Sequence, residues 1–178
     1  MDAATGELYA SCVVMFGTAQ MVPEQVTVLT PGARPTLHKR TTTDRNTVYL
    51  TALASTVLAT AKEALATSPA TTEVRVLTLR HDPAAPVPED GLVPIYVGRF
   101  PRIWMEALDW ARIDPVQTIH AAPSARLALN EATHEVVPIP LEDDAPAQQL
   151  IRSLRDEMAR NDPVDQSTRL APGRARTR

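Results

Sequence analysis

The chain has 178 residues, of which 44% are hydrophobic and only 4% are aromatic, and its formal net charge is −3. This length fits one domain with an aliphatic core. The slightly acidic balance excludes an overall field that attracts nucleic acid or anionic membranes, and the scarcity of aromatic rings argues against a base-stacking surface.

The composition also predicts the cellular compartment and the absence of a membrane segment. Cys12 is the single cysteine, so an intramolecular disulfide is impossible. The first residues show no basic region followed by an apolar stretch, and no apolar run reaches the roughly 20 residues of a membrane span. We therefore expect a cytoplasmic protein without a membrane segment.

The N-terminal third reads as three strands. Residues 7–16 are apolar on both alternating faces, which indicates a strand covered on both sides. Residues 26–30 and 34–40 form a hairpin across Pro31-Gly32, the usual pair for a type II turn. The returning strand is polar on one face, which is typical of an exposed or edge strand.

A long amphipathic helix is the clearest element of the sequence. Its apolar residues repeat at intervals of three and four over residues 44–67, and either Thr43 or Asp44 serves as its N-cap. Residues 73–80 then alternate as a buried strand. Residues 92–100 return as its hairpin partner after a Pro-rich loop.

The last part of the chain predicts short helices and one more hairpin. The element order therefore favours an α+β fold, with a mainly antiparallel sheet built from hairpins and covered by the long helix. We expect a single domain over 1–160 and a disordered basic tail over 161–178. The remaining predicted elements are helices near 102–112, 114–121 and 146–160 and a hairpin of 126–129 with 135–141.

Most common cofactor chemistry has no sequence signal here. Neither phosphate-loop nor dinucleotide-binding glycine spacing occurs, and no His-x-x-x-His pair or second cysteine suggests a metal site. Cys12 stands in the middle of an apolar strand, which favours a buried structural thiol over a nucleophile. We therefore predict no cofactor, no metal and no catalytic residue.

Five basic residues gather within twelve positions and form a candidate basic edge. Asp44 is the one acidic residue among them, and side chains from an edge strand could present this charge to an anionic partner. The alternative is ordinary solvated charge, or charge that protects a sheet edge from association. The residues are Arg34, His38, Lys39, Arg40 and Arg45.

Arg99 and Arg102 form a second basic feature. They stand on either side of Pro101, where a predicted helix begins, so the free N–H groups of its first turn would add partial positive charge. This arrangement predicts an anion-binding corner, against the alternative of ordinary surface charge.

Three functions of different class remain open. The leading hypothesis is a non-enzymatic domain that acts by protein–protein contact, as an accessory subunit or a homo-oligomer, through exposed strands at 34–40 or 92–100. The alternative is a nucleic-acid- or anion-binding accessory protein that uses the basic edge. The third is an enzyme with an unfamiliar site in the 81–102 hairpin, formed by His81 and Asp82 with Arg99 and Arg102.

Overall fold

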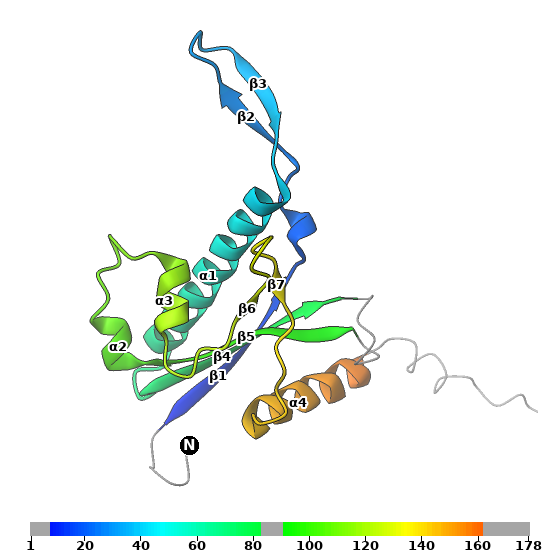
Figure 1. Ribbon diagram of the computed structural model, residues 1–178. Helices are drawn as coiled ribbons and strands as arrows, with labels where there is room; N and C mark the ends of the chain where they lie inside the picture. Colours follow the sequence, from blue (N-terminus) through cyan, green and yellow to red (C-terminus); the bar gives the residue numbers. More distant parts are fainter. Residues whose placement is uncertain (1–7, 83–90, 162–178) are drawn as a thin grey trace, which may run out of the picture. The chain divides into compact units, whose positions relative to one another are not determined.

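The computed structural model describes residues 8–82 and 91–161 (Figure 1). The chain forms two compact units, which divide between Pro140 and Leu141. The predicted α+β class is confirmed, because a long helix lies on a sheet and the other strands pair as hairpins. The predicted tail lies almost wholly outside the described residues, and its boundary stays a prediction.

The main sheet has three strands in the order β1-β4-β5. Strands β4 (Glu73–His81) and β5 (Leu92–Pro101) form the predicted antiparallel hairpin. Strand β1 (Tyr9–Phe16) instead runs parallel to β4, with Phe16 opposite Arg80 at the end of the pair. The sequence predicted a sheet built from hairpins and did not predict this parallel pair. Parallel pairing is possible here because a long connection that contains a helix joins the two strands.

Helix α1 (Thr42–Thr67) covers one face of this sheet through its apolar stripe, of which Leu53 and Val57 are completely buried. The N-cap is Thr41, so the assignment to Thr43 or Asp44 was wrong. The Thr41 hydroxyl accepts the Asp44 N–H at 3.1 Å, and the Asp44 carboxylate accepts the Thr41 N–H at 3.2 Å. This reciprocal capping box satisfies two backbone donors at the helix start.

Strands β2 (Gln25–Leu29) and β3 (Pro35–Lys39) form a separate hairpin that extends beyond the N-terminal end of α1 (Figure 1). The predicted type II turn is wrong, because Ala33 rather than Gly32 has a positive φ, of 55°. The loop has three residues between Thr30 and Arg34, and a left-handed last position keeps the flanking strands in register.

Two short helices and a small hairpin complete the first unit. Helix α2 (Arg102–Glu106) ends well before residue 112, because the Asp109 side chain accepts the Ala111 N–H and favours a turn over a helix. Helix α3 (Pro115–Ala121) follows as predicted, capped by Asp114. Strands β6 (Ala128–Leu129) and β7 (Val136–Val137) are shorter than predicted.

The second unit contains α4 (Ala145–Asn161), close to the predicted helix. The Asp144 carboxylate accepts the Ala147 N–H at 3.0 Å, as a capping residue does. Within the described residues, no helix combines the length and the apolar character that crossing a membrane requires.

Candidate functional site

The Arg99 guanidinium is bound to a carboxylate of its own chain. It donates to both oxygens of Glu73, with Nη2–Oε2 at 2.6 Å, and the Arg75 Nε donates to the same carboxylate at 2.9 Å. Burial alone raises the pKa of Glu73, but the hydrogen bonds and charges of Arg99 and Arg75 outweigh it and lower the pKa below its ordinary value. Arg99 is thus part of a cross-strand ion pair.

The Arg102 guanidinium closes the C-terminal end of α1. It donates to the carbonyl oxygens of Leu65 at 2.8 Å, Ser68 at 3.0 Å and Thr71 at 3.0 Å. The last turn of α1 carries no basic residue of its own, so Arg102 supplies the cation that a helix C-terminus favours. An anion-binding role for Arg99 and Arg102 stays a prediction, and both guanidinium groups already have partners.

The four residues of the proposed enzyme site do not converge. His81 pairs with Leu92 at one end of the β4–β5 hairpin, whereas Glu73 pairs with Pro101 at the other. Eight residues of extended strand separate the ends by about 25 Å. His81 and Asp82 therefore lie far from Arg99 and Arg102.

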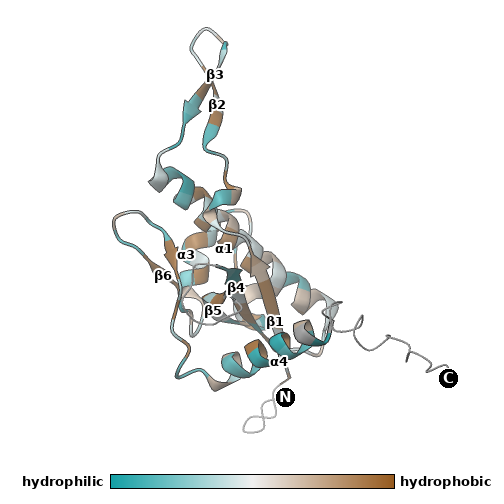
Figure 2. Ribbon diagram, turned by 90° about the vertical axis from the view of Figure 1, so that its right-hand side faces the viewer, coloured by the Kyte–Doolittle hydropathy of each residue, from teal (hydrophilic) through white to brown (hydrophobic). Residues whose placement is uncertain are grey.

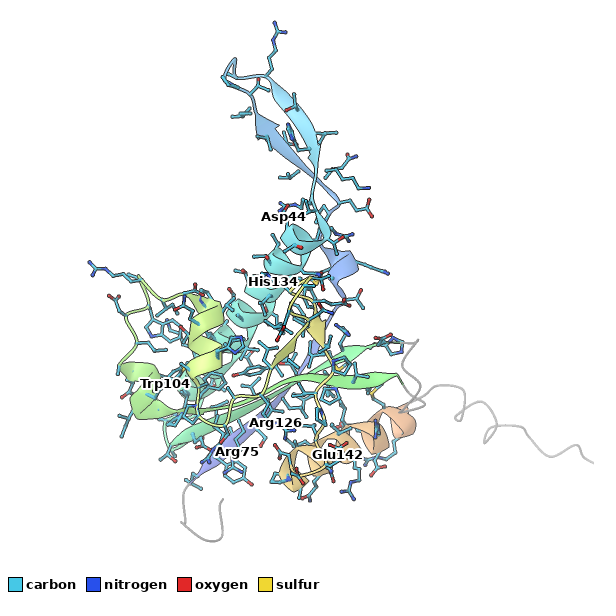
Figure 3. The ribbon with its side chains drawn as sticks, in the orientation of Figure 1. Asp44, Arg75, Trp104, Arg126, His134 and Glu142 are labelled. Atoms are coloured by element: carbon cyan, nitrogen blue, oxygen red, sulfur yellow. The ribbon has the colours of Figure 1, made fainter. Side chains whose placement is uncertain are left out.

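The basic edge is divided between the exposed hairpin and the start of α1. Arg34, His38 and Lys39 are exposed on the hairpin. Figure 3 shows that the side chains of this hairpin extend away from the ribbon on both sides. Arg45 is half-buried and donates to the carbonyl oxygens of Ala19 and Val22, so it fixes the chain that leads into β2. The half-buried Arg40 follows β3 directly.

The hairpin also contains apolar residues (Figure 2). Leu29 and Leu37 are 69% and 68% exposed, and Val28 is 42% exposed. Leu29 and Leu37 occupy the same face, because Thr27 pairs with Leu37 and Leu29 is two residues further along. Exposed aliphatic side chains next to cations are a surface that a partner could cover.

A cavity of about 230 Å³ lies at the carboxyl ends of β1 and β4. Its walls come from residues 18–20, from Asn46 and Tyr49 of α1, from Arg80 and Asp82, and from the turn before β7 together with the first residue of that strand. Figure 3 shows that turn, marked by His134, near the N-terminal half of α1, where Asn46 Nδ2 donates to the Thr133 carbonyl at 2.9 Å. Ligands of α/β sheets commonly bind outside the carboxyl ends of parallel strands.

Arg80 is the buried cation of this cavity, at 8% exposure. Its Nη1 donates to the Val136 carbonyl at 3.0 Å, and Nη2 lies 3.6 Å from Asp82 Oδ2. Its Nε is buried and has no hydrogen-bond partner within the described residues. Next to it, the Tyr49 hydroxyl donates to the Gly17 carbonyl at 2.7 Å; burial raises the pKa of Tyr49, and Arg80 offsets part of that increase.

Sequence reasoning missed this cavity because it depends on the parallel β1–β4 pair. A signal was nevertheless present: Arg80 continues the buried face of Val74, Val76 and Thr78, where an arginine is rarely left without a role.

Cys12 is half-buried against the core, where burial raises the pKa of its thiol. In residues 8–82 and 91–161, no group of three or more His, Cys, Asp or Glu side chains is placed to hold a metal ion.

No protein-family model, curated protein or solved structure matches this chain.

Proposed function

We propose that the protein is a protein–protein interaction domain that associates with a second copy of itself through the β2–β3 hairpin. The exposure of Leu29 and Leu37 on a two-stranded ribbon carries the proposal. An isolated hairpin is only marginally stable in water, and each leucine that a partner covers contributes about 1.5–3 kcal/mol. Association would therefore stabilise both the hairpin and the complex.

Charge favours a second copy as the partner. Residues 25–40 contain Arg34, Lys39 and Arg40 and no acidic residue, so this segment has a formal charge of +3. The chain has 18 basic and 21 acidic residues, which leaves 15 basic and 21 acidic residues elsewhere and a net charge of −6. A cationic hairpin is therefore electrostatically complementary to the remainder of another copy.

Light scattering over a concentration series tests self-association of the full chain. We expect the wild type to associate. The Leu29→Ser/Leu37→Ser variant should need at least about tenfold higher protein concentration for the same degree of association, because the lost apolar contacts weaken the free energy of association by more than about 1.4 kcal/mol. Ile103→Ser is the matched control, because Ile103 is 84% exposed but lies outside the hairpin. A wild type that stays monomeric throughout would overturn the proposal, as would equal association of the hairpin variant and the control.

Nucleic-acid binding is the second candidate function, favoured by the acid-free cationic stretch on a β-ribbon, since the major groove of DNA admits a two-stranded ribbon. Gel retardation at low salt distinguishes it from self-association. Retardation that disappears in Arg34→Gln/Lys39→Gln and persists in Leu29→Ser/Leu37→Ser would favour nucleic acid. Phosphate contacts also predict a steep decrease of affinity with salt.

A further inference from the structure

The cavity at Arg80 has the features of a built binding site rather than a surface depression. Four separate segments meet there, and two of its polar side chains are held in place by backbone carbonyls. Tyr49 is fixed by Gly17, and Arg80 is fixed by Val136. Side chains whose orientation is set before a ligand arrives lose little conformational entropy when the ligand binds.

Arg80 leaves hydrogen-bonding capacity unused at the floor of this cavity. A guanidinium has five N–H donors in a fixed plane. Besides the neighbouring Tyr49 hydroxyl, the described residues give Arg80 one carbonyl acceptor at 3.0 Å and one carboxylate at 3.6 Å, and the buried Nε has no hydrogen-bond partner among them. A buried cation is costly unless it is paired and hydrogen-bonded, so an anionic group next to Arg80 would be stabilised.

The other charges of the cavity exclude a simple anion as the best ligand. The Asp82 carboxylate lies on the wall, and Glu135 contributes an exposed carboxylate at the rim. A simple anion would meet these two negative charges, whereas a simple cation would meet Arg80. A molecule with one anionic end and one cationic end is complementary to both regions.

From this charge arrangement we infer that the cavity binds a small zwitterion of the α-amino acid class. The ligand carboxylate faces Arg80, and the ammonium group faces the carboxylate of Glu135. A volume of about 230 Å³ corresponds to the liquid volume of about eight water molecules, so a small amino acid fits and a nucleotide does not. The inference is independent of the hairpin and of self-association.

Titration of the full chain with L-alanine, acetate and methylammonium, each at the same ionic strength, tests the inference. Backbone amide NMR signals of Ala19, Asn46 and Arg80 report on the cavity walls. We expect saturable shifts with L-alanine at a dissociation constant on the order of 1 mM, and about tenfold or weaker binding of the two single-charge compounds.

Variants at the rim separate the proposed contact from general charge effects. Glu135→Gln keeps the shape of the exposed side chain, and we expect about tenfold weaker L-alanine binding with acetate binding retained or improved. Glu131→Gln is the matched control, because Glu131 is exposed in the same turn and does not line the cavity. Arg80→Lys is the second variant, and we expect it to weaken both L-alanine and acetate.

Three results would overturn the inference. The first is the absence of saturable shifts with L-alanine. The second is acetate binding as tight as that of L-alanine, which would indicate a plain anion site. The third is an equal effect of Glu135→Gln and Glu131→Gln on L-alanine affinity, because the rim carboxylate would then make no contact. Loss of folding in Arg80→Lys leaves the test intact, since the decisive comparison uses exposed residues.

Discussion

At the residue scale, Glu73 shows how a side chain at a candidate site can belong to the fold instead. Its side chain is only 9% exposed, and its carboxylate is shared by Arg75 of the same strand and Arg99 of the neighbouring strand β5. A carboxylate held by two guanidinium groups is more stable charged than protonated, which is why its pKa is lowered despite burial. The stability of the β4–β5 hairpin is therefore linked to pH.

We expect Glu73→Gln to lower the free energy of unfolding by about 1–3 kcal/mol at pH 7, because two guanidinium groups lose their shared partner. The lowered pKa also sets the sign of the pH effect. The carboxylate stabilises the fold fully above its unfolded pKa of about 4.3, and this stability is lost as pH falls toward the folded pKa.

Urea unfolding between neutral and acidic pH measures both effects. The wild type should lose stability below about pH 4.3 more steeply than Glu73→Gln. Glu106→Gln is the control, because its exposed carboxylate lies 3.7 Å from Arg102 in a surface pair and such pairs contribute little. Equal acid slopes for the wild type and Glu73→Gln would contradict the assignment of Glu73.

At the element scale, the glycine of the β2–β3 loop stands one position before the residue whose backbone is left-handed. Ala33 has a φ of 55°, whereas Gly32 lies outside the positive-φ region, and a Cβ added to Gly32 would meet no atom within 4 Å. The left-handed conformation costs an L-residue roughly 1–2 kcal/mol, and glycine avoids this cost. The hairpin is therefore less stable than the same hairpin would be with glycine at position 33.

We expect Ala33→Gly to stabilise the hairpin by about 0.5–1 kcal/mol, after the greater freedom of glycine in the unfolded chain is deducted. Gly32→Ala is the matched exchange, and it should be neutral or slightly stabilising. Amide hydrogen exchange of β2 and β3 measures this local opening directly. Faster exchange in Ala33→Gly than in the wild type would rule out strain at position 33.

Elements set by neighbouring residues were predictable from sequence, whereas pairing between distant segments was not. The apolar repeat located α1, and alternation located β4 and β5. The parallel β1–β4 pair joins strands separated by the hairpin and α1, so no local pattern indicates it. The Arg80 cavity was missed for the same reason, because it exists only where those two strands end together.

At the scale of the whole first unit, two buried tyrosines connect the core to distant backbone segments. Tyr49 and Tyr96 are 1% and 0% exposed, and their hydroxyls donate to the carbonyls of Gly17 at 2.7 Å and Ile119 at 3.0 Å. Burial raises the pKa of both phenols, because a phenolate in the core would lose its hydration. The packing of the core therefore opposes ionisation at high pH.

This opposition predicts alkaline unfolding with a defined slope. Because the pKa of each tyrosine is raised in the folded chain, its contribution to stability is complete below the unfolded pKa of about 10. Above that pH the unfolded chain loses its proton first, so the free energy of unfolding falls by about 1.4 kcal/mol per pH unit for each tyrosine. Tyr96→Phe should cost about 1 kcal/mol at neutral pH through the lost hydrogen bond, yet decline less steeply above about pH 10. Tyr49→Phe should behave in the same way, and the double variant should show the sum of both changes in slope. Urea unfolding monitored by circular dichroism across that pH range measures the slopes; unchanged slopes in the variants would mean that these phenols ionise as readily in the folded chain as in the unfolded one.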